Sequence, residues 1–216
     1  MSVLCHIAQA ARRFAREEDG TALVELALML PLFLLLFFGL VDFGRMGAEY
    51  VMADKAVQIA SRVAAVRPAA CAGLLPTNRR GTVPPNTTPP RFGTACSAGG
   101  GTICVAQSAA CTGLTGDPLV VNEIWAAISP LMPAGATTAN LSFRYDFDPA
   151  LNFLGGPYVP VVTVEIQNLN FQFVTPLAGL AALATGGTGT GPAGTLPFPV
   201  MSMSLPGEDL DLGENG

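Results

Sequence analysis

The longest apolar run in the chain is GTALVELALMLPLFLLLFFGLV, from Gly20 to Val41, and its only charged residue is Glu25. A helix needs about 20 predominantly apolar residues to cross a hydrocarbon core of about 30 Å. A single domain of this size rarely needs a helix that is apolar on every side. The pattern therefore predicts a membrane-spanning helix over 21–41. Pro31 is predicted to kink it, because proline removes one backbone hydrogen bond.

The helical pattern continues past this run. Small and apolar residues recur three, four or seven positions apart and form one stripe, at Met46, Ala53, Val57, Ala60 and Ala64. Such a stripe indicates a helix with one buried face. We expect one helix from about residue 23 to residue 67, ended by Pro68. Its second half, 42–67, would form the spine of a head.

The last part of the chain changes to a period of two, which is typical of half-buried strands. Leu141, Phe143, Tyr145 and Phe147 alternate with polar residues. A second strand carries apolar residues at 162, 164 and 166, and then switches parity at 169, 171 and 173. A regular strand cannot keep both sets on one face, so we expect a bulge or break at Gln167-Asn168.

Three further elements are expected around these strands. Asp117-Pro118 predicts an N-capped helix that stops near residues 130–133. Residues 177–184 predict a short apolar helix or turn, and 200–205 predict a final edge strand. The motif Gly189-x-Gly191-x-x-Gly194 formally matches a dinucleotide fingerprint. Pro192 interrupts it and no helix follows, so we interpret it as a flexible loop.

Residues 68–116 are rich in Pro and Gly and show neither helical nor strand period. They contain Cys71, Cys96, Cys104 and Cys111. In an oxidising compartment four cysteines can form two disulfides, in three possible pairings. A metal site is the competing interpretation. It is disfavoured because no C-x-x-C pair is present and the only histidine, His6, lies near the N-terminus. The sequence does not choose the pairing.

Composition restricts the function. Half of the residues are hydrophobic, 12% are charged and the net charge is −5, which fits a membrane or exported protein. Beyond Pro68 there are four Arg, no Lys and nine acidic residues, so no basic face for nucleic acid exists. With one histidine, the base or ligand of the common hydrolytic and metal chemistries is missing. We expect no enzymatic activity, no cofactor, no bound metal and no small-molecule substrate.

Glu25 is the unusual residue of the apolar run. A carboxylate within lipid is costly, so it is first interpreted as functional, with a partner to be named. If a peptidase cuts after Gly20, Thr21 becomes a new N-terminus with a charged α-amine, and Glu25 becomes residue five. The carboxylate of one subunit could then neutralise the α-amine of its neighbour. The alternatives are a Glu that snorkels to the headgroups, or an ordinary anchor.

This arrangement resembles type IV prepilins, which have a short basic leader, a Gly before the cut, a Glu at mature position five and a hydrophobic helix. Residues 20–62 resemble the TadE-like family, minor pilins or pseudopilins of the tight-adherence (Flp) pilus assembly system. Leu26 and Ser61 depart from the family pattern. The matching residues are Gly20, Val24, Glu25, Ala27, Pro31, Gly39, Asp42, Gly44, Arg45, Ala56, Ala60 and Arg62, followed by Ala64 and Ala65.

The resemblance implies an α+β protein with a long N-terminal helix, transmembrane in one half and periplasmic in the other. A small antiparallel, β-rich, pilin-like head with a Cys-containing loop would follow. The expected organisation is a leader over 1–20, a transmembrane helix over 21–41 within a TadE-like region over 20–62, and a periplasmic helix over 42–67. A Pro/Gly/Cys-rich loop over 68–116, a periplasmic head over 117–205 and an acidic tail over 206–216 complete it.

The implied function is that of a structural minor pilin or pseudopilin. It would be cleaved between Gly20 and Thr21, with Glu25 directing subunit docking. Implied partners are a prepilin peptidase, other pilins or pseudopilins, the inner-membrane assembly platform and membrane lipid. The N-terminus would be cytoplasmic, because the cysteines then lie in the periplasm. One alternative is an uncleaved, single-pass, membrane-anchored periplasmic binding or scaffold protein. Another is an exported soluble protein whose apolar run is a signal sequence.

Overall fold

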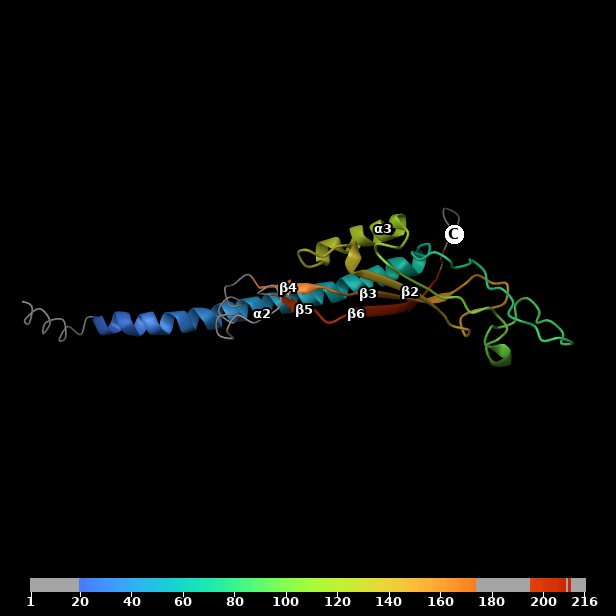
Figure 1. Cartoon of the computed structure of the whole chain (residues 1–216), viewed down its shortest axis with the longest axis horizontal. Helices are drawn as coiled ribbons and strands as arrows, with labels where there is room; N and C mark the ends of the chain where they lie inside the picture. Colours follow the sequence, from blue (N-terminus) through green and yellow to red (C-terminus); the bar gives the residue numbers. More distant parts are fainter. Residues whose placement is uncertain (1–19, 174–194, 209, 211–216) are drawn as a thin grey trace, which may run out of the picture. The chain divides into compact units, whose positions relative to one another are not determined.

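The computed structural model describes residues 20–173, 195–208 and 210 (Figure 1). Residues 1–19 of the expected leader, the short element over 177–184 and residues 186–194 of the expected glycine-rich loop over 186–195 lie outside these residues. The described residues form an α+β structure, as predicted. Its elements are α2 (Thr21–Val66), η2 (Ala98–Gly100), β1 (Ala109–Thr112), α3 (Pro118–Ile128), η3 (Ser129–Leu131), η4 (Thr138–Asn140), β2 (Leu141–Phe147), β3 (Pro160–Ile166), β4 (Asn170–Gln172), β5 (Thr195–Pro197) and β6 (Met201–Pro206).

Contacts divide the described residues into two units. The first contains 20–45 and Phe173; the second contains 46–172, 195–208 and 210. In the first unit the helix α2 includes Pro31. It is long and apolar enough to cross a membrane, and its most apolar window is entirely unburied. The long N-terminal helix is therefore confirmed, whereas the kink at Pro31 stays a prediction.

In the second unit four residues of the predicted stripe lie on the buried face of α2 together with Ala56, whereas Met46 is only partly buried. Ala53, Ala56, Val57, Ala60 and Ala64 are almost fully buried. They share one hydrophobic core with side chains of α3 and of the strands β2 and β3. Small side chains allow a helix backbone to approach its neighbours closely, so the alanines set the thickness of this core.

The main sheet has four antiparallel strands in the order β1-β2-β3-β6, of which Figure 1 labels β2, β3 and β6. Phe143 of β2 lies opposite Val164 of β3, and Tyr145 lies opposite Val162. All four side chains are buried, as their alternation with polar residues predicts. The expected strand near the C-terminus is β6, and it does form an edge of the sheet.

The expected break after β3 is also confirmed. β3 ends at Ile166, and Asn168 adopts a left-handed backbone conformation with φ 58°. Asparagine tolerates this region better than most residues. The chain then forms β4, which pairs with β5 in a separate two-stranded sheet. Leu169 and Phe171 are thereby buried despite their opposite parity.

Two strands were not predicted. β1 lies inside the segment 68–116, for which no strand was expected, and pairs along its length with β2. Its residues, AACT, are small and do not alternate between apolar and polar, so no local pattern predicts a strand here. β5 was missed because it ends at Pro197, in a stretch where Gly and Pro favour a loop. Both short strands exist because a partner strand supplies their hydrogen bonds.

The predicted start of α3 is confirmed. The Asp117 side chain accepts a hydrogen bond from the backbone N–H of Leu119 at 2.9 Å, and Pro118 occupies the first turn. α3 buries Val120, Val121, Ile124 and Ile128 in the core that it shares with α2 and the sheet.

Candidate functional site

The N-terminal half of α2 presents an exposed apolar surface. In an aqueous monomer this surface would be unfavourable by about 25 cal/mol per Å², so it indicates a lipid or protein environment. One such helix is compatible with a single-pass membrane anchor. The exposed large side chains are Leu23, Val24, Leu26, Leu28, Met29, Leu30, Leu32, Phe33, Leu34, Leu35, Leu36, Phe37, Phe38, Leu40, Val41 and Phe43.

The predicted processing and docking residues lie at the beginning of this surface. Gly20 is exposed and immediately precedes α2, which begins at Thr21. Glu25 is exposed in the second turn. Among the described residues, no side chain forms an ion pair with its carboxylate. The helix therefore presents an acidic group on an otherwise apolar surface.

A second acidic residue lies at the end of the apolar run. The carboxylate of Asp42 is almost completely buried and lies 3.5 Å from the guanidinium of Arg45, one turn further along α2. A buried carboxylate requires such compensation, because desolvation of a charge is costly. This ion pair was not predicted, although the i,i+3 spacing of an acid and an arginine was visible in the sequence.

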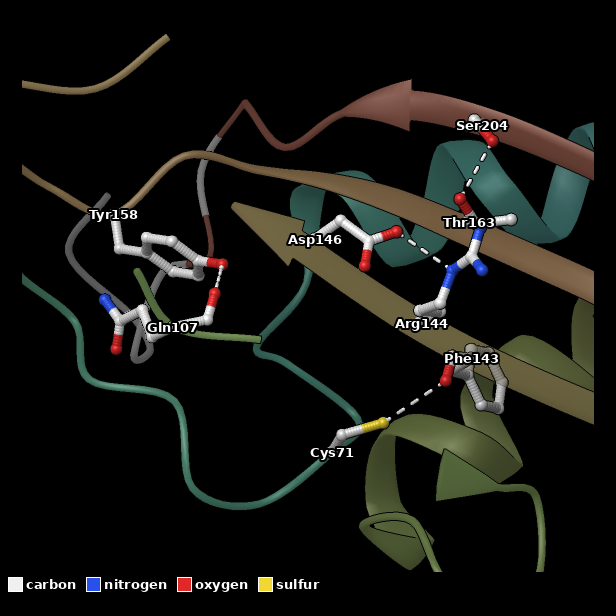
Figure 2. Close-up of polar contacts among 8 residues, drawn as sticks. All are labelled: Cys71, Gln107, Phe143, Arg144, Asp146, Tyr158, Thr163 and Ser204. Atoms are coloured by element: carbon white, nitrogen blue, oxygen red, sulfur yellow. Dashed lines mark hydrogen bonds and ion pairs between the residues drawn. The ribbon is translucent and has the colours of Figure 1, made fainter. Parts of the chain in front are cut away.

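The four cysteines of the head form two disulfides. Cys71 pairs with Cys111, and Cys96 pairs with Cys104. The prediction of disulfides is confirmed, and the structure supplies the pairing that the sequence left open. The sulfur of Cys71 also lies 3.7 Å from the carbonyl oxygen of Phe143 (Figure 2). A disulfide sulfur has no proton to donate, so this contact is packing.

The polar contacts around the sheet connect strands and loops (Figure 2). Arg144 and Asp146 form a half-exposed ion pair at 2.9 Å on β2, and the hydroxyls of Thr163 and Ser204 join β3 to β6 at 2.8 Å. The hydroxyl of Tyr158 donates to the carbonyl oxygen of Gln107 at 2.6 Å. Burial, with a smaller contribution from the negative charge of Asp146, raises the pKa of Tyr158 to about 12.

These head contacts are structural in character. Within the described part of the chain, no group of three or more His, Cys, Asp or Glu side chains is placed to hold a metal ion. The predicted site residues lie in separate places. Thr21, Glu25 and Pro31 lie on α2, directly after Gly20, and the cysteines lie in the head. The chemistry available at the N-terminal residues is electrostatic pairing.

Similarity to a known protein family is found in the region of α2. A family model described as TadE-like protein matches residues 20–62. The match covers 43 of the 216 residues, and this N-terminal region is therefore similar to TadE-like proteins. No curated protein and no solved structure matches the chain. The TadE-like region contains the exposed apolar surface, Glu25, the Asp42–Arg45 ion pair and most of the alanine stripe. The match suggests a protein associated with a tight-adherence pilus.

Proposed function

We propose that this protein is a structural minor pilin or pseudopilin that is cleaved after Gly20 and takes part in the assembly of a tight-adherence, Flp-type pilus. The observation that supports this most strongly is the TadE-like match over 20–62, in which Gly20 immediately precedes α2 and Glu25 lies on its exposed apolar surface. We also propose that the protein has no enzymatic activity.

Docking would be driven by the attraction between two opposite charges. Cleavage creates a positive α-amine at Thr21 at the edge of the membrane, and Glu25 carries a negative charge nearby in sequence. Two unit charges attract each other far more strongly in a lipid-like environment than in water. A neighbouring helix that brings its α-amine to Glu25 removes both uncompensated charges. The exposed apolar side chains around them exchange lipid contacts for contacts with that neighbour.

The proposed arrangement is a single-pass protein of the bacterial inner membrane. Its leader over 1–20 faces the cytoplasm and its head faces the periplasm, where the two disulfides would persist. The proposed partners are a prepilin peptidase, other pilins or pseudopilins, the assembly platform and membrane lipid. Incorporation into the pilus and retention in the assembly base would both use the same docking residue, Glu25.

The first experiment is the intact mass and N-terminal sequence of the protein recovered from native membranes. A mature chain that begins TALVE supports processing between Gly20 and Thr21. A chain that retains residues 1–20 favours the alternative, an uncleaved membrane-anchored binding or scaffold protein. A product that leaves the membrane on fractionation indicates a signal sequence and contradicts both.

The docking step has its own test. Glu25→Ala should leave the protein in the membrane but abolish its co-purification with pilus components, while Asp54→Ala should leave co-purification unchanged. Asp54 is a matched control because it is an exposed carboxylate on the same helix, beyond the apolar run. Normal co-purification of the Glu25→Ala protein would refute the docking role.

A further inference from the structure

The segment 76–104 of the head contains an open pocket of about 240 Å³. Pockets for drug-sized ligands usually measure about 300–1,000 Å³, so this one suits a single ring-sized group. Its polar lining consists of one guanidinium and several hydroxyls. The lining includes Arg80, Thr82, Thr87, Thr88, Thr102 and Ile103.

The charge of this segment differs from that of the rest of the head. Residues 68–116 contain three arginines, Arg79, Arg80 and Arg91, and no Asp, Glu or Lys. Residues 117–216 contain nine acidic residues and a single arginine. The pocket therefore lies in a positively charged region of an acidic protein. Such local charge favours an anionic ligand.

Arg80 is held in position at the pocket. Its guanidinium donates to the carbonyl oxygen of Pro90 at 3.0 Å and lies 5.3 Å from the centre of the Phe92 ring. Phe92 is 75% exposed, yet its ring packs so closely on Gly155 that a Cβ atom there would overlap it. An arginine and an aromatic ring that are fixed before binding lose little conformational entropy when a ligand arrives.

The two walls of the pocket are joined to each other. The backbone N–H of Gly81 donates to the carbonyl oxygen of Ile103 at 2.8 Å, and that of Val105 donates to Arg79 at the same distance. The disulfide between Cys96 and Cys104 anchors the second wall. Among the described residues, the hydroxyls of Thr82 and Thr88 have no hydrogen-bond partner, so they are available to a ligand.

We propose that this pocket binds one acidic sugar unit of a polysaccharide. The guanidinium of Arg80 matches the geometry of a carboxylate, the threonine hydroxyls can donate to and accept from sugar hydroxyls, and the exposed Phe92 ring offers an apolar surface beside them. A folded protein partner needs about 800 Å² of surface per side, which this small pocket does not supply. The inference goes beyond the proposed assembly role and does not depend on cleavage or on Glu25.

The test is a calorimetric titration of the full chain in detergent micelles with three probes. Tetragalacturonate carries carboxylates on sugar rings, maltotetraose carries the rings without charge, and tetraglutamate carries the charge without rings. We expect binding of tetragalacturonate at least tenfold tighter than binding of either control. Equal binding of maltotetraose, equal binding of tetraglutamate, or no binding of tetragalacturonate would overturn the proposal. Equal binding of tetraglutamate would instead indicate an acidic peptide as the ligand.

Substitutions in and next to the pocket test whether the ligand binds there. Arg80→Gln should weaken tetragalacturonate binding at least tenfold, whereas Arg79→Gln should change it less than threefold, because the neighbouring Arg79 does not line the pocket. Equal losses would mean general attraction by positive charge and would overturn the proposal. Thr82→Trp fills the pocket without removing charge and should also abolish binding. If Thr82→Trp retains full affinity, the ligand does not occupy this pocket.

Discussion

The hydroxyl of Tyr145, in the middle of β2, accepts a hydrogen bond at 2.9 Å from the backbone N–H of Ala70, shortly after the end of α2. Both residues are completely buried. The contact joins positions 75 residues apart and fixes where the chain leaves the helix and crosses the sheet. Burial raises the pKa of Tyr145, although the hydrogen bond from Ala70 acts in the opposite direction.

Removal of this hydroxyl should destabilise the head. Tyr145→Phe leaves the buried N–H of Ala70 without a partner, and an unsatisfied buried donor costs about 1–3 kcal/mol. Urea unfolding of the full chain in detergent, followed by the fluorescence of Trp125, measures this loss. Trp125 is the only tryptophan and packs against the core. An unchanged unfolding midpoint would show that the hydrogen bond contributes nothing.

The two disulfides should contribute unequally. Cys71–Cys111 spans 40 residues, whereas Cys96–Cys104 spans 8. On the loop-entropy relation they restrict the unfolded chain by about 4 and about 2.5 kcal/mol, respectively. The double variant Cys71→Ala/Cys111→Ala should therefore unfold at lower urea concentration than Cys96→Ala/Cys104→Ala. Equal midpoints, or the reverse order, would contradict this account.

Because one face of α2 is tightly packed, the effect of a larger side chain on stability should depend strongly on its position along the helix. Ala60 is fully buried in the shared core, while Arg62 is exposed on the same helix. Ala60→Leu should overfill the core and cost about 1–3 kcal/mol. Arg62→Leu introduces the same side chain at the surface and should change stability by less than about 0.5 kcal/mol. Similar urea midpoints for the two variants would indicate a loosely packed helix.

Stability should fall in alkali. The pKa of Tyr158 is raised to about 12 in the folded chain, against about 10 for an exposed tyrosine. Its contribution is therefore complete below about pH 10 and is lost as the pH rises toward 12, because only the unfolded chain releases the proton in this window. Urea midpoints between pH 9 and 12, with thiols blocked to prevent disulfide exchange, should decrease with pH.

Tyr158→Phe provides the control for the alkaline loss. It removes the hydrogen bond to Gln107 and should lower stability near neutral pH by about 1 kcal/mol. Its midpoint should then decline less between pH 10 and 12 than that of the unaltered chain. Parallel declines would assign the effect to other groups.

The sequence alone determined the elements whose signals are local. The predominantly apolar run from Thr21 to Val41, followed by an alanine-rich stripe, predicted α2, and the alternation at 141–147 predicted β2. The change of parity after Ile166 located the break in the sheet, and Asp117-Pro118 located the start of α3. These signals depend on residues within a few positions of one another, so they can be recognised in the sequence without knowledge of the tertiary structure.

Only the tertiary structure decided the features that join distant residues. β1 has no pattern of its own and exists because β2 supplies its hydrogen bonds. The choice of Cys71–Cys111 and Cys96–Cys104 among three pairings, like the approach of Arg80 to Phe92, depends on how the segments between them pack. Periodicity specifies which face of an element is buried, but it does not specify what lies against that face.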